Sequence, residues 1–162
     1  PYDNTLAYPL IWTISKAIGG QFETFKEKGF SKVANILAGS LVEKDQLLRS
    51  QDNLLVVSSR VLDESLNTVK QYAEDDESSS PLTGIIITGD EAISEEAMTY
   101  INQHNLPVVR TELDTYGVVI QISKLEVKIN RRTPWKISKA IELIQENVDF
   151  QYMIDQLKTS DR

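Results

Sequence analysis

Three short segments of this chain place hydroxyl groups, glycine and arginine directly after runs of apolar residues. The runs cover residues 54–57, 85–87 and 108–109, and short runs of this kind are typical of strands buried on both faces. The carboxyl ends of parallel strands meet at one edge of a sheet, where ligands usually bind. Hydroxyls, backbone N–H groups and guanidinium groups together favour an anion such as a phosphate or a carboxylate. The residues concerned are Ser58, Ser59, Arg60, Thr88, Gly89, Asp90, Arg110 and Thr111.

Asp114 and Thr115 extend this candidate ligand-binding set, because they begin another predicted helix shortly after the third run. A structural interpretation of the whole set stays open. Loops after strands are polar in most proteins, and serine, threonine and aspartate commonly cap helices. The residue types and their order therefore indicate an anion site or a set of caps, and both interpretations are kept.

A second basic cluster lies around the predicted start of the last helix, at Lys128, Arg131, Arg132 and Lys136. The positive end of a helix dipole attracts anions, so this cluster is a candidate for binding a phosphate or an acidic face of a partner subunit. The alternative is a solvated surface whose charges balance nearby glutamates.

Helices and strands are predicted to alternate along the chain. Apolar spacing predicts helices over 9–18, 42–49, 61–73, 95–103 and 134–147 and another from Asp114 onward, with strands over 33–37, 54–57, 85–87 and 106–109 and an extended piece at 126–129. Residues 74–80 are polar and acidic, which predicts a solvated loop. The alternation predicts an α/β fold, with a layered and mainly parallel sheet flanked by helices.

The composition narrows the class of protein. The 162 residues include 17 basic and 24 acidic side chains, which gives a net charge of −7 and a pI near 4.8. This acidic balance argues against a general nucleic-acid or anionic-membrane binder, and no apolar run is long enough to span a membrane. The absence of cysteine excludes disulfides, thiolate zinc sites and cysteine nucleophiles, and it fits a cytoplasmic protein.

No catalytic, metal or cofactor constellation is recognisable in the sequence. The phosphate-binding loop motif and the dinucleotide fingerprint are absent, so we expect no cofactor. Asp90, Glu91, Glu95 and Glu96 are acidic enough to suggest a site for a hard cation, but Glu95 and Glu96 are better explained as the first turn of a helix. His104 is the only histidine and falls at a predicted helix end. An enzyme that uses Asp90, Asp114 and His104 therefore ranks far behind a binding role, because nothing assembles a nucleophile, a base and an oxyanion site.

Residues 10–150 resemble the DRTGG domain family, which is named for an aspartate–arginine pair after one strand and Thr-Gly-Gly after a later one. The corresponding segments here read Val57-Ser58-Ser59-Arg60 and Ile87-Thr88-Gly89-Asp90. Further landmarks similar to the family lie at 14–20, 33–40, 106–108, 113–116, 136–137 and 148–149. Two residues depart from the pattern: Ser59 replaces the aspartate, and Asp90 replaces the second glycine, where a left-handed backbone is expected.

The resemblance implies a fold similar to the N-terminal domain of HPr kinase/phosphorylase. Members of the family stand next to dethiobiotin-synthetase-like P-loop domains, within some phosphate acetyltransferases, and between CBS modules in certain pyrophosphatases. We therefore expect residues 1–9 to be a linker or a cut edge, residues 10–150 to be the DRTGG-like domain, and residues 151–162 to be a C-terminal tail.

Two functional hypotheses follow from the resemblance. The first is a non-catalytic regulatory and oligomerisation domain, with a homodimer favoured, in a larger P-loop or phosphate acetyltransferase-like protein. The alternative is a sensor that binds a nucleotide or another phosphate-bearing anion at the predicted sheet edge. Neither hypothesis includes a nucleic acid or a membrane as a partner.

Overall fold

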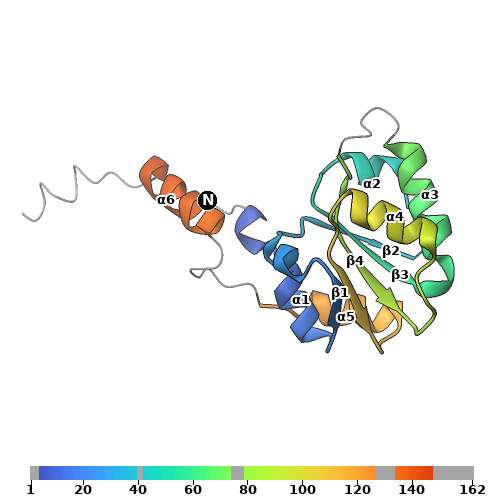
Figure 1. Cartoon of the computed structure of the whole chain (residues 1–162). Coiled ribbons are helices and arrows are strands. Elements are labelled where there is room, and N and C mark those ends of the chain that lie inside the picture. The colour runs from blue at the N-terminus through green and yellow to red at the C-terminus, as the bar shows by residue number, and fades with distance from the viewer. Residues whose placement is uncertain (1–3, 40–41, 74–78, 127–133, 148–162) are drawn as a thin grey trace, which may run out of the picture. The chain divides into compact units, whose positions relative to one another are not determined.

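The computed structural model describes residues 4–39, 42–73, 79–126 and 134–147 of the chain (Figure 1). These residues form two compact units. One unit comprises the described residues from Tyr8 to Glu126 and contains the sheet. The other contains a short 3-10 helix, η1 (Asn4–Ala7), and the helix α6 (Pro134–Asn147). Of the predicted extended piece at 126–129, only Glu126 is among the described residues. Residues 74–78 of the predicted acidic loop also lie outside them.

A five-stranded sheet organises the larger unit. Its strands are β1 (Gln21–Thr24), β2 (Asn35–Ala38), β3 (Asn53–Ser58), β4 (Leu82–Thr88) and β5 (Val108–Thr111), in the spatial order β1-β5-β4-β3-β2. The pairs β2–β3, β3–β4 and β4–β5 are parallel, and β1 lies antiparallel to β5 at one edge. This arrangement confirms the predicted α/β fold with a mainly parallel sheet, and β4 is its central strand.

Helices cover both faces of the sheet. The helices α2 (Lys44–Leu48), α3 (Leu62–Tyr72) and α4 (Glu95–Gln103) connect the parallel strands and lie on one face, while α1 (Ile11–Ala17) and α5 (Thr115–Ser123) lie on the other (Figure 1). Two further 3-10 turns are η2 (Lys26–Phe30) and η3 (Ser59–Val61). Because each crossover helix returns the chain to the start of the next strand, the carboxyl ends of β2 to β5 share one edge.

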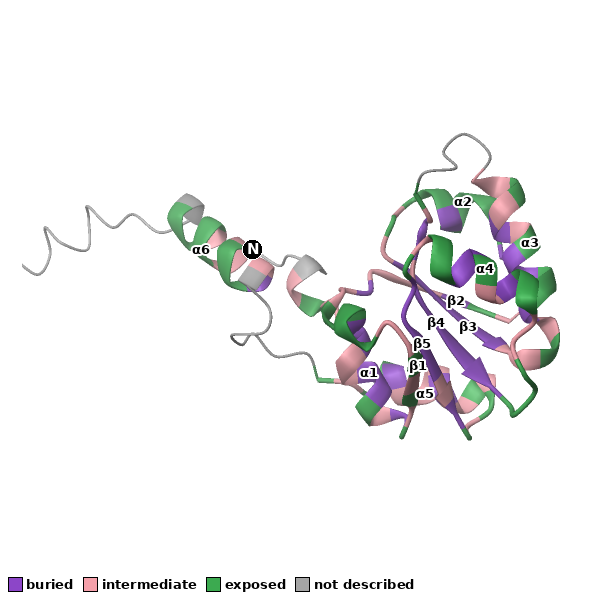
Figure 2. Ribbon diagram, viewed as in Figure 1, coloured by how far each residue is buried: buried purple, intermediate pink, exposed green. Residues whose placement is uncertain are grey.

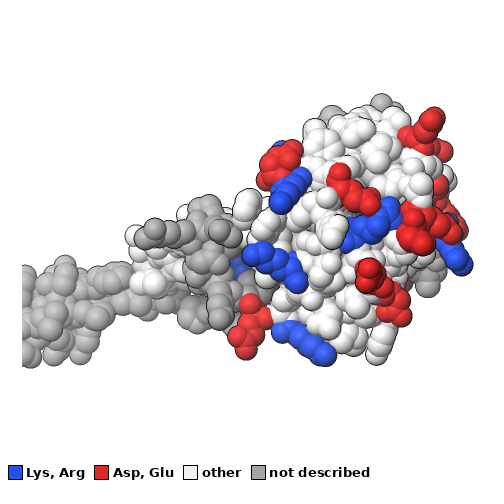
Figure 3. Space-filling model, turned by 60° about the horizontal axis from the view of Figure 1, so that its bottom comes forward, with Lys and Arg blue, Asp and Glu red and all other residues white. Residues whose placement is uncertain are grey.

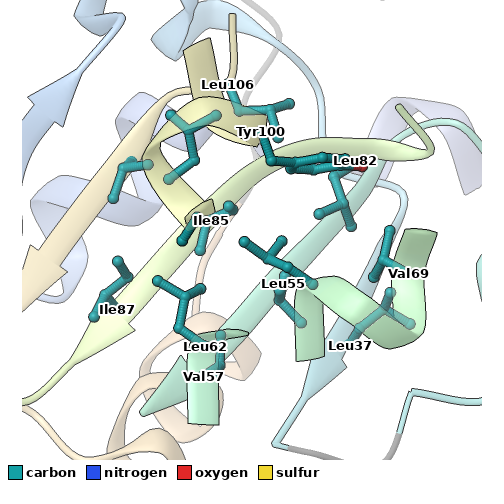
Figure 4. Packing of buried hydrophobic residues seen from close by; sticks show 14 of the residues in the cluster. Leu37, Leu55, Val57, Leu62, Val69, Leu82, Ile85, Ile87, Tyr100 and Leu106 are labelled. Atoms are coloured by element: carbon teal, nitrogen blue, oxygen red, sulfur yellow. The ribbon is translucent and has the colours of Figure 1, made fainter. Parts of the chain in front are cut away.

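The core consists of two apolar layers, one on each face of the sheet. Alternate residues of a strand point to opposite faces, so Val57, Ile85 and Ile87 pack toward α3 and α4, whereas Val56 and Ile86 pack toward α1 and α5. Figure 2 shows buried residues along the central strands, and Figure 4 shows the first of the two layers in detail. Burial on both faces explains why these strands carry uninterrupted apolar runs rather than an alternating pattern.

The ends of the helices follow local capping chemistry. Ser94 is the N-cap of α4, and its hydroxyl accepts a hydrogen bond from the Ala97 N–H at 3.0 Å. The predicted stop after the first helix is also confirmed, since Gly19 follows the C-cap of α1 with a φ of +61°. The start of α1 differs from the expectation at Pro9, because Leu10 is held in an extended bridge with Lys32 and the helix begins at Ile11.

The smaller unit contains the last predicted helix, which α6 confirms with the bounds expected from Pro134 onward. Lys136 is buried, and its Nζ has no hydrogen-bond partner among the residues that the structure describes; burial lowers the pKa of this ammonium group. This burial removes Lys136 from the expected exposed basic cluster. The other three members, Lys128, Arg131 and Arg132, lie outside the described residues. In the described part of the chain, no helix is both long enough and apolar enough to cross a membrane.

Candidate functional site

The strand ends predicted to meet do lie side by side at the carboxyl edge of the sheet. Ser58 at the end of β3 is in register with Thr88 at the end of β4, and Thr88 is in register with Thr111 at the end of β5. Neighbouring strands lie about 5 Å apart, so the loops that follow these residues form one continuous rim. The topology therefore brings together residues that are more than fifty positions apart in the sequence.

The threonines of this rim lie on the α1 and α5 side of the sheet. The Thr88 and Thr115 hydroxyl oxygens are 3.4 Å apart, and the Thr111 hydroxyl donates to the Ile18 carbonyl at 2.8 Å. Thr88 and Thr111 are each only 4% exposed. Thr111 therefore ties β5 to the end of α1, and of the three threonines, the half-buried Thr115 is the most accessible to a ligand.

Asp114 is the N-cap of α5, as its position before a helix predicted. Its Oδ1 accepts a hydrogen bond from the Gly117 N–H at 2.7 Å. This contact satisfies one of the free N–H groups at the helix start, so capping accounts for the aspartate at this position. A role for Asp114 in ligand binding stays a prediction.

The turn after the central strand contains Gly89 in a left-handed conformation. Its φ is +88°, and a Cβ atom at this position would lie 2.9 Å from the Ser59 hydroxyl oxygen. Asp90 is exposed, and it is not among the described non-glycine residues with positive φ. The expectation that Asp90 replaces a left-handed glycine is therefore wrong, because the turn takes its left-handed residue one position earlier.

The two arginines of the predicted set lie close to this turn and already hold carboxylates. Arg110 forms a two-point ion pair with Glu23 of β1, through Nε and Nη2, and its Nη1 donates to the Gly89 carbonyl at 2.7 Å. Arg60 in η3 donates from Nε to the Glu91 carboxylate at 3.1 Å. The residues 89–91 are therefore held from one side by β5 and from the other by η3.

Two more carboxylates belong to the site: Glu23, which the sequence did not reveal, and Glu91, which it suggested only as part of an acidic cluster for a hard cation. Glu23 lies on an antiparallel edge strand that was not predicted, 87 positions from its partner Arg110. Together with Asp90 and Asp114 they give the rim four carboxylates against the guanidinium groups of Arg60 and Arg110. Figure 3 shows basic side chains next to acidic ones across the face that lies at the bottom of Figure 1. An anion that binds here must compete with carboxylates of the chain itself.

His104 lies at the other edge of the sheet. It is the C-cap of α4, its ring centroid is 4.5 Å from that of Tyr100, and burial lowers its pKa. The Tyr100 hydroxyl is 2.8 Å from that of Ser80, which precedes the amino end of β4. The alternative that joined His104 with Asp90 and Asp114 in one catalytic site is therefore wrong, because α4 separates the histidine from the carboxyl edge.

Metal binding has no support from the arrangement of the acidic side chains that the structure describes. Among these residues, no three histidine, aspartate or glutamate side chains gather as a metal site. Glu95 and Glu96 occupy the first turn of α4, where carboxylates stabilise the positive end of the helix dipole.

Comparison with known proteins gives two findings. The family model of the DRTGG domain matches residues 70–125, a stretch that contains the turn after β4, the whole of β5 and the helix α5. A solved structure of the CBS and DRTGG domains in the regulatory region of a Clostridium perfringens pyrophosphatase, complexed with its activator diadenosine tetraphosphate, is 15% identical, with a TM-score of 0.45. The similarity covers 75% of this chain and 50% of that structure, so the chain spans about half of its length.

Proposed function

We propose that this chain, whose residues 70–125 carry a DRTGG domain, is a regulatory module that binds a phosphate-bearing small molecule at the carboxyl edge of its sheet. The module carries out no reaction of its own. Its conformation signals to a further domain whether the ligand is bound. The family resemblance makes a P-loop or a phosphate acetyltransferase-like domain of the same protein the expected recipient. A cytoplasmic location is part of the same proposal.

The observation that carries this proposal is the position of the turn at 88–91 between two guanidinium groups. Arg110 reaches the turn from β5 and Arg60 reaches it from η3, so two cations from separate elements flank one loop. Guanidinium groups bind phosphates through two parallel N–H donors, and glycine turns let a phosphate approach the backbone closely. The Thr115 hydroxyl at the start of α5 adds a further polar group at the same edge.

Calorimetric titration tests this function directly. The ligand panel is inorganic phosphate, ATP, acetyl phosphate, acetyl-CoA and diadenosine tetraphosphate, titrated into the wild-type chain and into Arg60→Ala and Arg110→Ala. The matched control is Arg49→Ala, since Arg49 is exposed after α2 and has no ion pair with any described residue. We expect saturable binding of at least one phosphate-bearing ligand, a loss of about tenfold or more in Arg110→Ala, and no change in the control. Absence of binding across the panel would contradict the proposal.

A second candidate function, assembly of two copies through α6, is favoured by the exposed apolar residues of that helix. Ile137, Ile141 and Ile144 are 37%, 49% and 49% exposed, and their spacing of four and three residues places them on one stripe. Paired helices commonly bury such a stripe. Sedimentation velocity over a concentration series tests it. If two copies assemble through α6, we expect a dimer. Ile141→Asp should dissociate this dimer, whereas Ser138→Asp, which lies outside the stripe, should leave it intact.

A further inference from the structure

We infer that Glu23 is an internal counter-ion of Arg110, so that a phosphate-bearing ligand competes with Glu23 for this guanidinium and thereby loosens the edge strand β1. The inference rests on the proposed function, because it describes how ligand binding at the carboxyl edge is regulated.

The ion pair occupies the part of Arg110 that a phosphate would use. Glu23 accepts hydrogen bonds from Nε and Nη2, the two donors that form the bidentate edge of a guanidinium group. The Arg110 and Glu23 side chains are 21% and 33% exposed, so the pair is partly shielded from solvent but still accessible to it. Nη1 is engaged with the Gly89 carbonyl. A ligand can therefore approach Arg110 from the solvent side, and two-point binding through Nε and Nη2 requires that Glu23 leave.

Besides Glu23, the edge strand β1 is held by its pairing with β5, by the ring of Phe22 and by the side chain of Thr24. It spans four residues, pairs with β5 alone, and its register with β5 shifts between Phe22 and Thr24. The Thr24 hydroxyl donates to the Leu106 carbonyl at 2.9 Å and accepts from the Val108 N–H at 3.1 Å, which fixes the carboxyl end of the strand. Glu23 is the side chain that links β1 to the carboxyl edge of the sheet, so its release loosens the strand near the proposed ligand.

An aromatic cluster lies directly behind β1 and can report this change. The Phe22 ring stacks on Trp12 of α1 with centroids 5.7 Å apart, and Phe30 of η2 stacks on the same indole at 6.0 Å. Lys16 and Lys26 place their ammonium groups 5.2 and 5.3 Å from the Trp12 ring. A displacement of Phe22 changes the surroundings of the indole, so the fluorescence of Trp12 follows the state of the strand.

The pair between Arg60 and Glu91 serves as an internal comparison. It consists of one hydrogen bond, and the two side chains are 80% and 51% exposed. Exposed single-contact pairs contribute little, because solvent screens them and both side chains lose conformational freedom. Glu91 also belongs to the turn itself and not to a separate strand. Removal of its charge is therefore expected to change ligand binding less than removal of the charge on Glu23.

The experiment compares three charge-neutralising variants of the whole chain, Glu23→Gln, Glu91→Gln and Glu27→Gln. Glu27 is exposed in η2 and has no ion pair with any described residue, so it controls for the overall change in net charge. Inorganic phosphate and ATP are the probes, with binding measured by calorimetry at fixed ionic strength. We expect Glu23→Gln to bind about five- to tenfold more tightly than wild type, and the other two variants to stay within about twofold.

Fluorescence gives a second readout in a Trp135→Phe background, where Trp12 is the remaining tryptophan. Ligand addition is expected to change the Trp12 spectrum of the parent protein. The Glu23→Gln variant is expected to show most of that change before any ligand is added. Glu23→Ala provides a second variant in case the glutamine forms a new hydrogen bond to Arg110, and it should behave in the same way.

The outcomes separate the inference from the function on which it rests. If wild type binds a probe and Glu23→Gln binds it equally or more weakly, the counter-ion role is overturned while the binding function stands. If only the Glu23 variants bind, the competition is confirmed in its strongest form. If no variant binds either probe, the inference fails, and the proposed site fails with it when the other ligands of the calorimetric panel do not bind either.

Discussion

The Nη1 group of Arg110 donates a hydrogen bond to the Gly89 carbonyl at 2.7 Å, which fastens the turn after the central strand to the neighbouring strand β5. The same guanidinium group holds Glu23 of β1. One side chain therefore links three strands at the carboxyl edge of the sheet. The conformation of Gly89 and the position of Arg110 are expected to depend on each other.

Substitution of Gly89 tests how tightly this turn is constrained. Gly89→Ala is expected to destabilise the fold by about 2 kcal/mol, because an L-residue is strained at a φ of +88° and the new methyl group meets Ser59. Urea unfolding measures the loss. Gly39→Ala is the control, since Gly39 has a φ of +77° with nothing within 4 Å of an added Cβ, and it carries the backbone strain alone.

The contribution of the contact with Ser59 can be isolated in a double variant. Gly89→Ala combined with Ser59→Gly removes the neighbouring hydroxyl and should recover the part of the loss that exceeds Gly39→Ala. A loss in Gly89→Ala no larger than that in Gly39→Ala would show that the contact with Ser59 adds no cost to the backbone strain. A double variant that recovers nothing would point to the backbone as the whole cause.

The role of Asp114 as an N-cap can be tested by measuring the stability of two variants. As an N-cap, Asp114→Ala is expected to cost about 1 kcal/mol in the free energy of unfolding, whereas Asp114→Asn retains an acceptor and should lose much less. Thermal and urea unfolding of both variants provide the measurement. Equal losses for alanine and asparagine would show that the negative charge, rather than the hydrogen bond to Gly117, is what the fold requires.

Much of this fold is readable from the sequence because its core strands are buried on both faces. The apolar runs at 54–57 and 85–87 identify β3 and β4, and Ser94 and Asp114 identify the starts of α4 and α5. These signals are local, so a single sequence contains them. The convergence of the strand ends then follows from the parallel topology.

The part that the sequence did not reveal depends on contacts between distant residues. β1 has four residues, none fully buried, and its apolar content is a single phenylalanine, so neither length nor periodicity identifies it. The sequence therefore offers no reason to single out Glu23, and it predicts that Arg110 binds a ligand. The pairing of β1 with β5 is what joins them, and only the folded chain shows it.

Stability at the opposite edge of the sheet is expected to depend on Asn53. This side chain is fully buried, and its Nδ2 lies 3.0 Å from the Leu47 carbonyl and 2.8 Å from the Pro81 carbonyl, while its Oδ1 accepts from Asn35. Asn53→Ala removes the side-chain hydrogen bonds to these buried carbonyls, which should cost about 3 kcal/mol. Asn35→Ala, at a half-buried position, should cost about 1 kcal/mol. Urea unfolding that ranks the two in the opposite order would contradict this account.

The pH dependence of stability provides a test of the environment of His104. Burial lowers the pKa of this histidine from the ordinary value of 6.5, so the folded chain binds the proton less readily than the unfolded chain. Well above pH 6.5, His104 is neutral in both states and does not affect stability. As the pH falls below 6.5 and through the lower pKa of the folded state, the free energy of unfolding declines. Because the sequence has a single histidine, the effect can be assigned.

The measurement is the melting temperature between about pH 8 and pH 5.5, above the range in which ordinary carboxylates titrate. Wild type should lose more stability over this interval than His104→Gln, which cannot take up the proton. Identical pH profiles for the two proteins would mean that the imidazole is as well solvated in the folded chain as in the unfolded one.

Amide NMR during a titration with ATP tests the central claim most directly, because it maps binding onto individual residues without a substitution. We predict saturable shifts at residues 58–60, 88–91 and 110–115, accompanied by shifts in β1 at residues 21–24. Shifts that instead cluster near His104 at the opposite edge, or no shifts at all, would contradict the assignment of the ligand site to the carboxyl edge of the sheet.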